Sequence, residues 1–297
     1  MTDRILDLSE SPASLAVRTG RLVICVNDEI IQTSSFRDLA VIVASHPAVT
    51  YTQAVIARLL ENNGVFIACN EKRMPVGMIL PLDGHFIQAE RFARQAAASL
   101  PTRKRLWQQI VKAKIRAQAR LLNDLYDRDE GIGALADTVR SGDTGNVEAQ
   151  AARRYWQALF RDTSFKRHRE GDPPNNLLNY GYAVLRGIVA RGLCAAGLHP
   201  SLGLHHHNRY NAFCLVDDLM EPLRPIVDRA VIVWLKDSDG DVDLHRETKR
   251  RLIGALTERV IIEGERRTLF DVAHITAVSL AGVFTGECRN LVLPEAG

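Results

Sequence analysis

The hydrophobic pattern of the chain changes at a turn sequence over residues 81–84. Before it, short β-branched runs recur between turn signals such as Asn27-Asp28, and only residues 52–61 have helical periodicity. After it Ala, Arg, Lys, Gln and Leu dominate, and these residues favour helices. We therefore predict an α+β fold. A small β-rich N-terminal domain over residues 1–84 precedes a larger, mainly α-helical domain over residues 85–297.

The two predicted domains differ in what they can do. The short strands of the first favour antiparallel pairing, and its sequence holds no cluster of catalytic residue types, which favours a dimerisation or scaffolding role. In the second, residues 175–198 form a nearly continuous run of small and apolar residues containing Gly181, Gly187 and Gly192. A glycine inside a helix costs roughly 1 kcal/mol relative to alanine. Close packing against neighbouring helices would explain all three, so this run predicts a central buried helix.

Composition narrows the class of protein. The chain has 297 residues, a net charge of +3 and five cysteines without a CxxC pair. That pattern favours neither a disulfide framework nor a zinc ribbon. The sequence shows no apolar run of membrane-spanning length, and its first residues lack the apolar core of a signal peptide. We expect a cytoplasmic protein that does not enter a membrane.

Residues 202–228, LGLHHHNRYNAFCLVDDLMEPLRPIVD, place ionisable side chains in a segment that otherwise resembles protein core. Burying such groups is costly unless something pairs them. Asp218 and Glu221 are three residues apart, so one helical turn would put both carboxylates on one face. His206 precedes Asp218 by twelve residues, with turn-forming residues between them that let the chain double back. One histidine and two carboxylates suit Mg²⁺ or Mn²⁺ better than Zn²⁺. A structural polar network accounts for the same residues, and both readings stay open here.

Two further segments carry candidate residues. Asn146 is a predicted N-cap that puts Glu148 in the first turn of a helix over residues 147–160, facing inward. Arg153 and Arg154 lie on a neighbouring face of that helix. Lys112 and Lys114 belong to a basic helix that precedes it. A charged helix face is usually just solvated, and contact with a phosphate backbone is the alternative for these four residues.

Three motifs occur in a fixed order: GNVEAQAARRYWQALF, NNLLNYGYAVLRG and the segment over residues 202–228. With them, the chain resembles over nearly its whole length the CRISPR-associated adaptation integrases. These are the larger, catalytic proteins of the spacer-acquisition complex. The NRYNAF…DDLMEP variant resembles the branch that accompanies type II systems.

The resemblance implies roles for particular residues. Glu148, His206 and Glu221 would be catalytic metal ligands for Mg²⁺ or Mn²⁺, with Asp218 beside them. His205 and His207 depart from the family pattern, and their imidazoles would compete for the ion. The implied activity is insertion of spacer DNA into a CRISPR array, in which a 3′-hydroxyl attacks a phosphodiester at the repeat.

The resemblance also implies partners. They are double-stranded DNA (protospacer and repeat), a second copy that forms a homodimer through the β domain, and the second adaptation protein. The type II effector nuclease is a further candidate. A non-catalytic DNA-binding scaffold is the rival function. A zinc hydrolase built on His205–His207 is disfavoured, because the sequence has no HExxH motif and no paired cysteine ligands.

Overall fold

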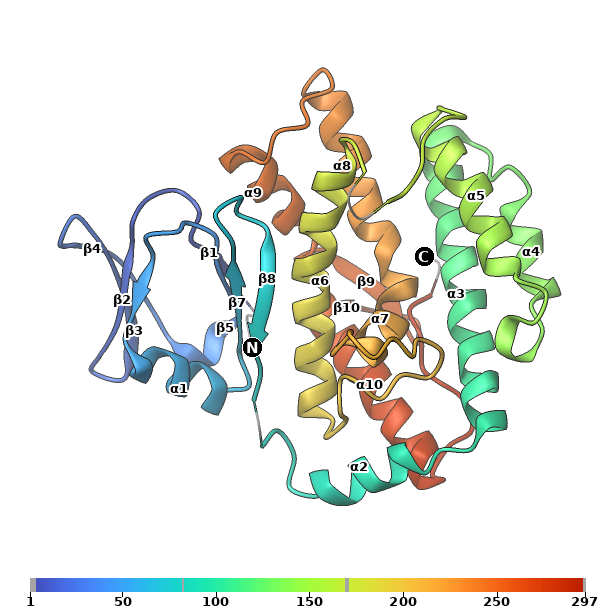
Figure 1. Ribbon diagram of the computed structural model, residues 1–297, viewed down its shortest axis with the longest axis horizontal. Coiled ribbons are helices and arrows are strands. Elements are labelled where there is room, and N and C mark those ends of the chain that lie inside the picture. The colour runs from blue at the N-terminus through green and yellow to red at the C-terminus, as the bar shows by residue number, and fades with distance from the viewer. Residues whose placement is uncertain (1–3, 82, 169–170, 296–297) are drawn as a thin grey trace.

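The computed structural model describes residues 4–81, 83–168 and 171–295. Strands gather in the N-terminal part of the molecule and helices in the rest, with α6 (Asn175–Ala195) between the two (Figure 1). The predicted α+β fold is confirmed. The division into two domains at residue 84 stays a prediction. Val41, Val65 and Ile67 of the sheet belong to the same buried cluster as the helices, so the hydrophobic core runs through that boundary.

The N-terminal strands form two four-stranded sheets. One has the order β1-β5-β7-β8 and the other β4-β3-β2-β6. The strands of the first are β1 (Arg4–Asp7), β5 (Leu39–Ala44), β7 (Val65–Cys69) and β8 (Pro75–Ile79). Those of the second are β2 (Ser14–Arg18), β3 (Arg21–Val26), β4 (Glu29–Ser34) and β6 (Thr50–Tyr51).

Strand pairing in these sheets differs from the antiparallel prediction. β1, β5 and β7 pair in parallel, and so do β2 and β6. The helix α1 (Gln53–Glu61) lies between β5 and β7 in the chain and supplies the crossover that parallel neighbours require. Antiparallel pairing is right for β2-β3-β4 and for β7-β8. Asn27 and Asp28 form the two-residue turn before β4, both with positive φ, as this hairpin type demands.

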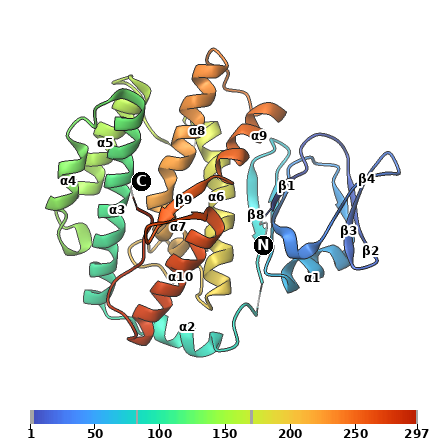
Figure 2. The ribbon, with the colours of Figure 1, turned by 180° about the vertical axis from the view of Figure 1, so that it is seen from behind.

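The helical part wraps around α6. Its helices are α2 (Gln88–Ala96), α3 (Leu100–Tyr126), α4 (Ile132–Thr138), α5 (Val147–Phe160), α7 (Cys214–Met220), α8 (Arg224–Asp237), α9 (Arg246–Ala255) and α10 (Leu269–Thr285). Short 3-10 turns are η1 (Phe36–Asp38), η2 (Ser141–Asp143) and η3 (Glu221–Leu223). A hairpin of β9 (Arg259–Ile262) and β10 (Glu265–Thr268) connects α9 to α10 and is visible from behind (Figure 2).

The three glycines of α6 explain why it can occupy the centre. A Cβ at Gly181 would lie 2.4 Å from Val227 of α8, and one at Gly187 would lie 2.8 Å from Ile67 of β7. At Gly192 it would lie 3.0 Å from the backbone of Ala273 in α10. The predicted central buried helix is confirmed. One of the three close approaches is to the sheet rather than to a helix.

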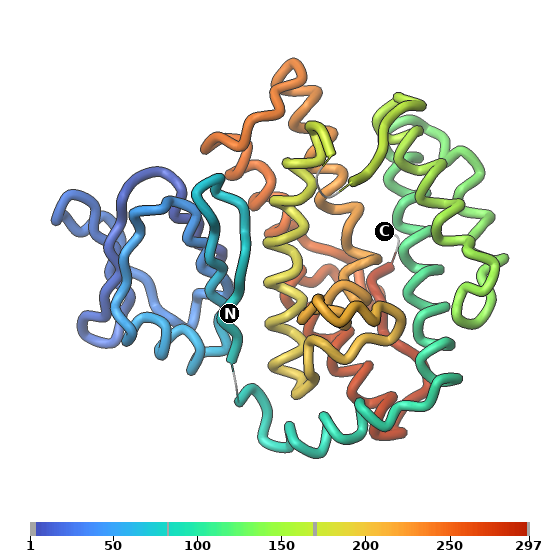
Figure 3. The backbone as a smooth tube through the Cα atoms, in the orientation of Figure 1, coloured from blue at the N-terminus to red at the C-terminus, as the bar shows by residue number. Residues whose placement is uncertain are grey.

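The course of the chain decides where a site can form. From β8 it runs through α2 below α6 and α10, then rises as α3 on the far side of the molecule (Figure 3). The segment α7–η3 lies between α3 and α6 and contacts both. Over the described ranges, no helix is both long and apolar enough to span a lipid bilayer.

Candidate active site

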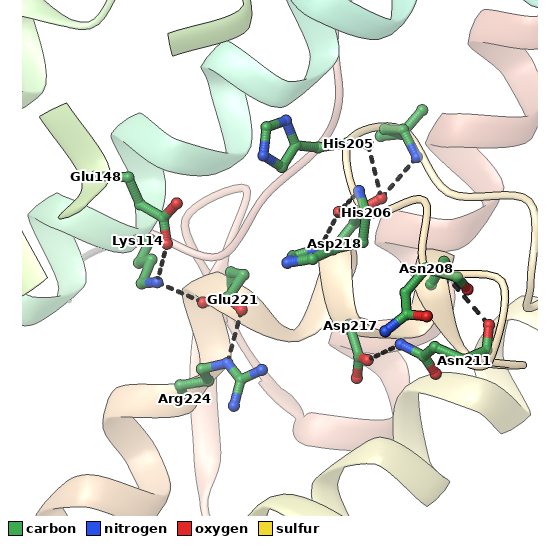
Figure 4. Close-up of polar contacts among 12 residues, drawn as sticks. Lys114, Glu148, His205, His206, Asn208, Asn211, Asp217, Asp218, Glu221 and Arg224 are labelled. Carbon is green, nitrogen blue, oxygen red and sulfur yellow. Dashed lines mark hydrogen bonds and ion pairs between the residues drawn. The ribbon is translucent and has the colours of Figure 1, made fainter. Parts of the chain in front are cut away.

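Three elements bring charged side chains together around Lys114 of α3. Its Nζ lies 2.5 Å from Oε1 of Glu148, at the start of α5, and 2.6 Å from Oε2 of Glu221, in η3 (Figure 4). The side chains of Lys114 and Glu221 are only 10% and 6% exposed, and that of Glu148 is 27% exposed. Two carboxylates 73 positions apart in the sequence therefore converge on one positive charge.

Glu148 is fixed by the way α5 begins. The carboxylate of Asp143 accepts hydrogen bonds from the backbone N–H groups of Val147 and Glu148, at 2.9 and 3.0 Å. Asn146 has a positive φ and makes no side-chain cap bond. Asn146 occupies the predicted N-cap position, but the side chain of Asp143 accepts the cap bonds, because η2 carries Asp143 back over the helix end. The predicted place of Glu148 in the first turn is right.

Glu221 is held by two cations. The Nε of Arg224, one helical turn on, donates to its Oε1 at 2.9 Å, while Lys114 lies at its Oε2. Burial alone would raise the pKa of Glu221, but Arg224 and Lys114 outweigh burial and lower that pKa to about 2. Nζ of Lys114 forms an ion pair with Oε2, so each oxygen of Glu221 already faces one cation.

Asp218 folds the chain back as predicted. It is fully buried, and its Oδ2 accepts the backbone N–H groups of Leu204 and His205 at 2.6 and 3.1 Å. Its Oδ1 lies 2.6 Å from Nδ1 of His206. A Cβ at Gly203 would lie 2.4 Å from the His206 carbonyl oxygen, so only glycine fits this turn. Asp218 therefore orients His206, and both of its oxygens are already engaged.

His206 presents its other nitrogen to the site. Since Nδ1 faces Asp218, Nε2 is left for a ligand, and the ring extends from Asp218 toward the side where Glu221 and Lys114 lie (Figure 4). The hydrogen bond that the Nδ1–H group donates to Asp218 raises the pKa of His206, and burial opposes this effect. An imidazole oriented by a carboxylate through one nitrogen is the usual arrangement of a histidine that ligates metal through the other.

The three consecutive histidines diverge. The His205 ring stacks on Trp107 of α3, with centroids 4.3 Å apart and planes 2° from parallel. The His206 ring meets the same indole edge-on at 5.7 Å. The side chain of His207 is exposed. This divergence gives no support to a zinc site made from all three.

The donor set fits a hard divalent ion in kind. Two carboxylates and one imidazole nitrogen are typical ligands of Mg²⁺ or Mn²⁺. As the side chains lie, however, no three His, Cys, Asp or Glu residues within the described part of the chain are grouped to hold an ion. The ammonium of Lys114 accounts for this, because it takes the position between Glu148 and Glu221 where a cation would bind.

The predicted DNA contacts fall into two groups. Arg153 and Arg154 are exposed on α5, and Lys112 is half-buried on α3. Lys114 is buried and engaged by two carboxylates, so its position does not suit contact with a DNA backbone. It lies seven residues after Trp107, two helical turns on, and so shares the inward face of α3.

Sequence reasoning missed three residues that shape this site: Trp107, Asp143 and Arg224. Arg224 had a usable signal, because it follows Glu221 by three residues, the spacing of an ion pair within a helix. Asp143 is one of several turn residues before α5. Nothing local marks Trp107 as a partner of the histidines.

Comparison with known proteins fixes the family. Residues 6–258 match the family model described as "CRISPR associated protein Cas1". The chain belongs to the Cas1 family. A curated relative named CRISPR-associated endonuclease Cas1, from Neisseria meningitidis serogroup C, is 37% identical over 99% of this chain and 97% of its own length.

Solved structures agree on the Cas1 fold. A "Casposase bound to integration product" matches with a TM-score of 0.83 and 20% identity, covering 97% of this chain and 92% of the other. A "Cas6-RT-Cas1--Cas2 complex" matches with a TM-score of 0.76 and 20% identity, covering 99% of this chain and 36% of the other. At such identities the likeness concerns the fold alone.

Proposed function

We propose that this Cas1-family chain is a metal-dependent DNA integrase and endonuclease that inserts spacer DNA into a CRISPR array. The 3′-hydroxyl of the incoming strand attacks a phosphodiester at the repeat and forms a new phosphodiester, while the P–O3′ bond of the repeat strand breaks and its 3′-hydroxyl leaves. One observation carries the proposal: Glu148 and Glu221 converge on a single cation while Asp218 orients His206 toward them. Relatives named endonucleases and a structural neighbour bound to an integration product support it.

Each residue has a task in this proposal. Glu148, Glu221 and His206 would hold Mg²⁺ or Mn²⁺. Such an ion lowers the pKa of the attacking hydroxyl or water and stabilises charge on the transferring phosphate. Asp218 keeps His206 in the tautomer that leaves Nε2 free, and Arg224 keeps Glu221 ionised. Without an ion, Lys114 and Arg224 together balance the charges of the two carboxylates. Arg153, Arg154 and Lys112 would contact the DNA backbone.

The partners follow from the same family. We propose double-stranded DNA as substrate and the second adaptation protein as partner, in keeping with the Cas1–Cas2 complex among the structural neighbours. A homodimer through the N-terminal strands fits β4, an edge strand whose Ile30 and Ile31 are 53% and 61% exposed. The type II branch, with its effector nuclease as a further partner, rests on the NRYNAF…DDLMEP motif. A cytoplasmic location stays a prediction.

The test is joining of a labelled DNA fragment to a plasmid that carries a repeat. Reactions contain Mg²⁺, Mn²⁺ or EDTA, with and without the second adaptation protein. Glu148→Gln removes one charge at nearly constant volume, and we expect it to reduce joining at least a hundredfold. Glu61→Gln, on the exposed end of α1, is the matched control and should join at the wild-type rate. Joining by Glu148→Gln at that rate would remove Glu148 from the site.

The DNA-binding scaffold keeps one observation in its favour: Lys114, Glu148 and Glu221 already form a closed ion-pair network. In that case the network is purely structural and needs no metal. Titration of the purified chain with Mn²⁺, followed by calorimetry, separates the two functions. Stoichiometric binding that Glu148→Gln abolishes supports the integrase, and no binding supports the scaffold.

A further inference from the structure

The ring of His205 lies between an indole and the candidate metal ligand His206. It stacks on Trp107 of α3 with the two planes 2° apart. Its centroid lies 5.5 Å from that of the His206 ring, and these two planes meet at 84°. Trp107 in turn meets His206 edge-on. One ring from α3 and two from the loop before α7 therefore form a closed aromatic cluster.

Polar contacts hold His206 on one side only. Its backbone N–H and its Nδ1 both face Oδ1 of Asp218, at 3.3 and 2.6 Å. A single hydrogen bond to the ring tolerates a spread of angles, so it fixes the tautomer but not the tilt of the ring. The side chain is 42% exposed, so solvent leaves room for such a tilt. Among the residues that the structure describes, only Trp107 and His205 place rings against it.

Trp107 contributes a fixed wall to this cluster. It is only 1% exposed, and its Nε1–H group has no hydrogen-bond partner within the described ranges of the chain. A buried indole N–H usually has a partner, and leaving it without one costs free energy. No polar contact offsets that cost here, so the indole is held by packing alone. What it offers to the loop is the face on which His205 stacks.

His205 is fixed against this wall rather than placed as a ligand. Its backbone N–H donates to Oδ2 of Asp218 at 3.1 Å, which anchors the start of the side chain. Its ring lies beside α3, whereas the His206 ring extends toward Glu221 (Figure 4). To reach an ion held by the two glutamates, the His205 ring would have to give up its stack on the indole.

We propose that His205 is a positioning residue that acts through His206. Stacked on the indole, its ring closes the side of the His206 ring that the carboxylate leaves open, and so keeps Nε2 directed toward the candidate metal position. The inference rests on the proposed function, in which His206 holds a metal ion. The imidazole of His205 therefore supports the ligand instead of competing with it.

The first test measures Mn²⁺ binding to the full chain by calorimetry. His205→Ala removes the ring, and we expect the dissociation constant to rise about tenfold, as when an outer contact to a metal ligand is lost. His205→Phe keeps a ring without nitrogen atoms and should bind within about twofold of the wild type. His207→Ala, at the neighbouring exposed histidine, is the matched control and should change nothing.

Two results of this test would contradict the proposal. An equal loss of affinity in His205→Phe and His205→Ala would show that a nitrogen of His205 itself binds the ion. An unchanged affinity in His205→Ala would show that the ring does not support the site. Position 205 is exposed, so the fold should survive both changes, and thermal unfolding in EDTA checks this.

A double-mutant cycle shows whether His205 acts through His206. In the background of His206→Ala there is no ligand left to position. Adding His205→Ala should then change Mn²⁺ affinity by less than about twofold, because the two effects share one cause. A second loss as large as that in the wild-type background would mean that His205 acts independently of His206, and the proposal would be wrong.

A third measurement needs no metal ion. Diethyl pyrocarbonate modifies accessible imidazole nitrogens, and mass spectrometry gives the rate for each histidine in EDTA. We expect His206 to react about threefold faster in His205→Ala, because its ring then tilts toward solvent, and at the wild-type rate in His205→Phe. His207 of the same chains is the internal control and should react equally in all three. An unchanged rate of His206 in His205→Ala would refute the positioning role.

These measurements separate the failure of this inference from the failure of the proposed function. If the wild type bound no Mn²⁺ but His206 still reacted faster in His205→Ala, the metal-dependent function would fall and the support of His206 by His205 would stand. If the wild type bound Mn²⁺ and His205→Ala bound it equally well, only this inference would fall.

Discussion

Replacing Lys114 by methionine tests the centre of the site most directly. The change keeps the length of the side chain but removes the ammonium that lies 2.5 and 2.6 Å from Glu148 and Glu221. Breaking a buried ion pair by removing one partner costs about 3–5 kcal/mol. Glu148 is partly solvated, so we take the lower end, about 3 kcal/mol, for Lys114→Met in EDTA. At roughly 2–4 °C per kcal/mol, the melting temperature should fall by about 6–12 °C.

A divalent ion should reverse much of this loss. In the proposed metal site of the wild type, an ion would have to displace the ammonium to bind both carboxylates, whereas Lys114→Met has no ammonium there. We expect Mn²⁺ to bind the variant at least about tenfold more tightly, which corresponds to about 1.4 kcal/mol. At a hundredfold excess over its dissociation constant, the ion would return about 2.7 kcal/mol of stability. The variant should therefore approach the wild-type melting temperature as Mn²⁺ rises.

The assay is thermal unfolding in EDTA and along a Mn²⁺ series. Lys112→Met, a half-buried lysine on the same helix, is the control and should show neither the loss in EDTA nor the larger recovery. Equal shifts with Mn²⁺ in the wild type and in Lys114→Met would show that the ammonium does not compete with the ion. An unchanged melting temperature in EDTA would show that the two ion pairs contribute nothing.

Two further predictions concern stability away from the carboxylates. Burial raises the pKa of Asp228 from 3.8 to about 6, so between these values the folded state keeps a proton that the unfolded state releases, and stability falls as pH rises. Urea unfolding should show that the free energy of unfolding falls by up to roughly 3 kcal/mol between these two pH values, at about 1.4 kcal/mol per pH unit. In Asp228→Asn the free energy of unfolding should no longer depend on pH in this range. An equally steep pH dependence in the variant would contradict the assignment to Asp228. Gly181→Ala should destabilise the protein by about 1–3 kcal/mol, because its Cβ would meet Val227 at 2.4 Å. Gly254→Ala is the control: Gly254 lies in an exposed turn of α9, and a Cβ there would meet no atom within 4 Å, so this change should be neutral or stabilising. Equal losses of stability in the two variants would show that close packing is not the reason for glycine at position 181.

The sequence predicted best what is encoded locally. The helix over residues 147–160 has the predicted bounds, because apolar periodicity and a polar lead-in define both of its ends. The return of His206 onto Asp218 was also predicted, since turn-forming residues separate them. The buried helix α6 followed from its glycines, whose cost in a helix demands an explanation in packing.

What failed depends on contacts between distant segments. In the sequence, Lys114 is one of several cations on a basic helix. It becomes a counter-ion only because α5 and η3 place Glu148 and Glu221 on the same side of α3. Asp143, rather than the side chain of Asn146, accepts the cap bonds of α5, because a 3-10 turn folds Asp143 back over the helix end. β4 was missed because its sequence lacks the alternation of a half-buried strand: the adjacent residues Ile30 and Ile31 are both exposed. The parallel pairing was missed because short strands suggested antiparallel neighbours. The helix between β5 and β7 was a signal for it, since parallel strands need a crossover connection.

One helix, α3, carries both Trp107, which packs against His205 and His206, and Lys114, which pairs with the two carboxylates. These two side chains are seven residues apart, a rise of about 10 Å along the axis. Sliding or rolling of this helix would therefore shift imidazole and acid groups in step, while the loop over residues 203–206 keeps its internal bonds. A force on its outer surface, where Lys112 lies, would reach both halves of the candidate site at once.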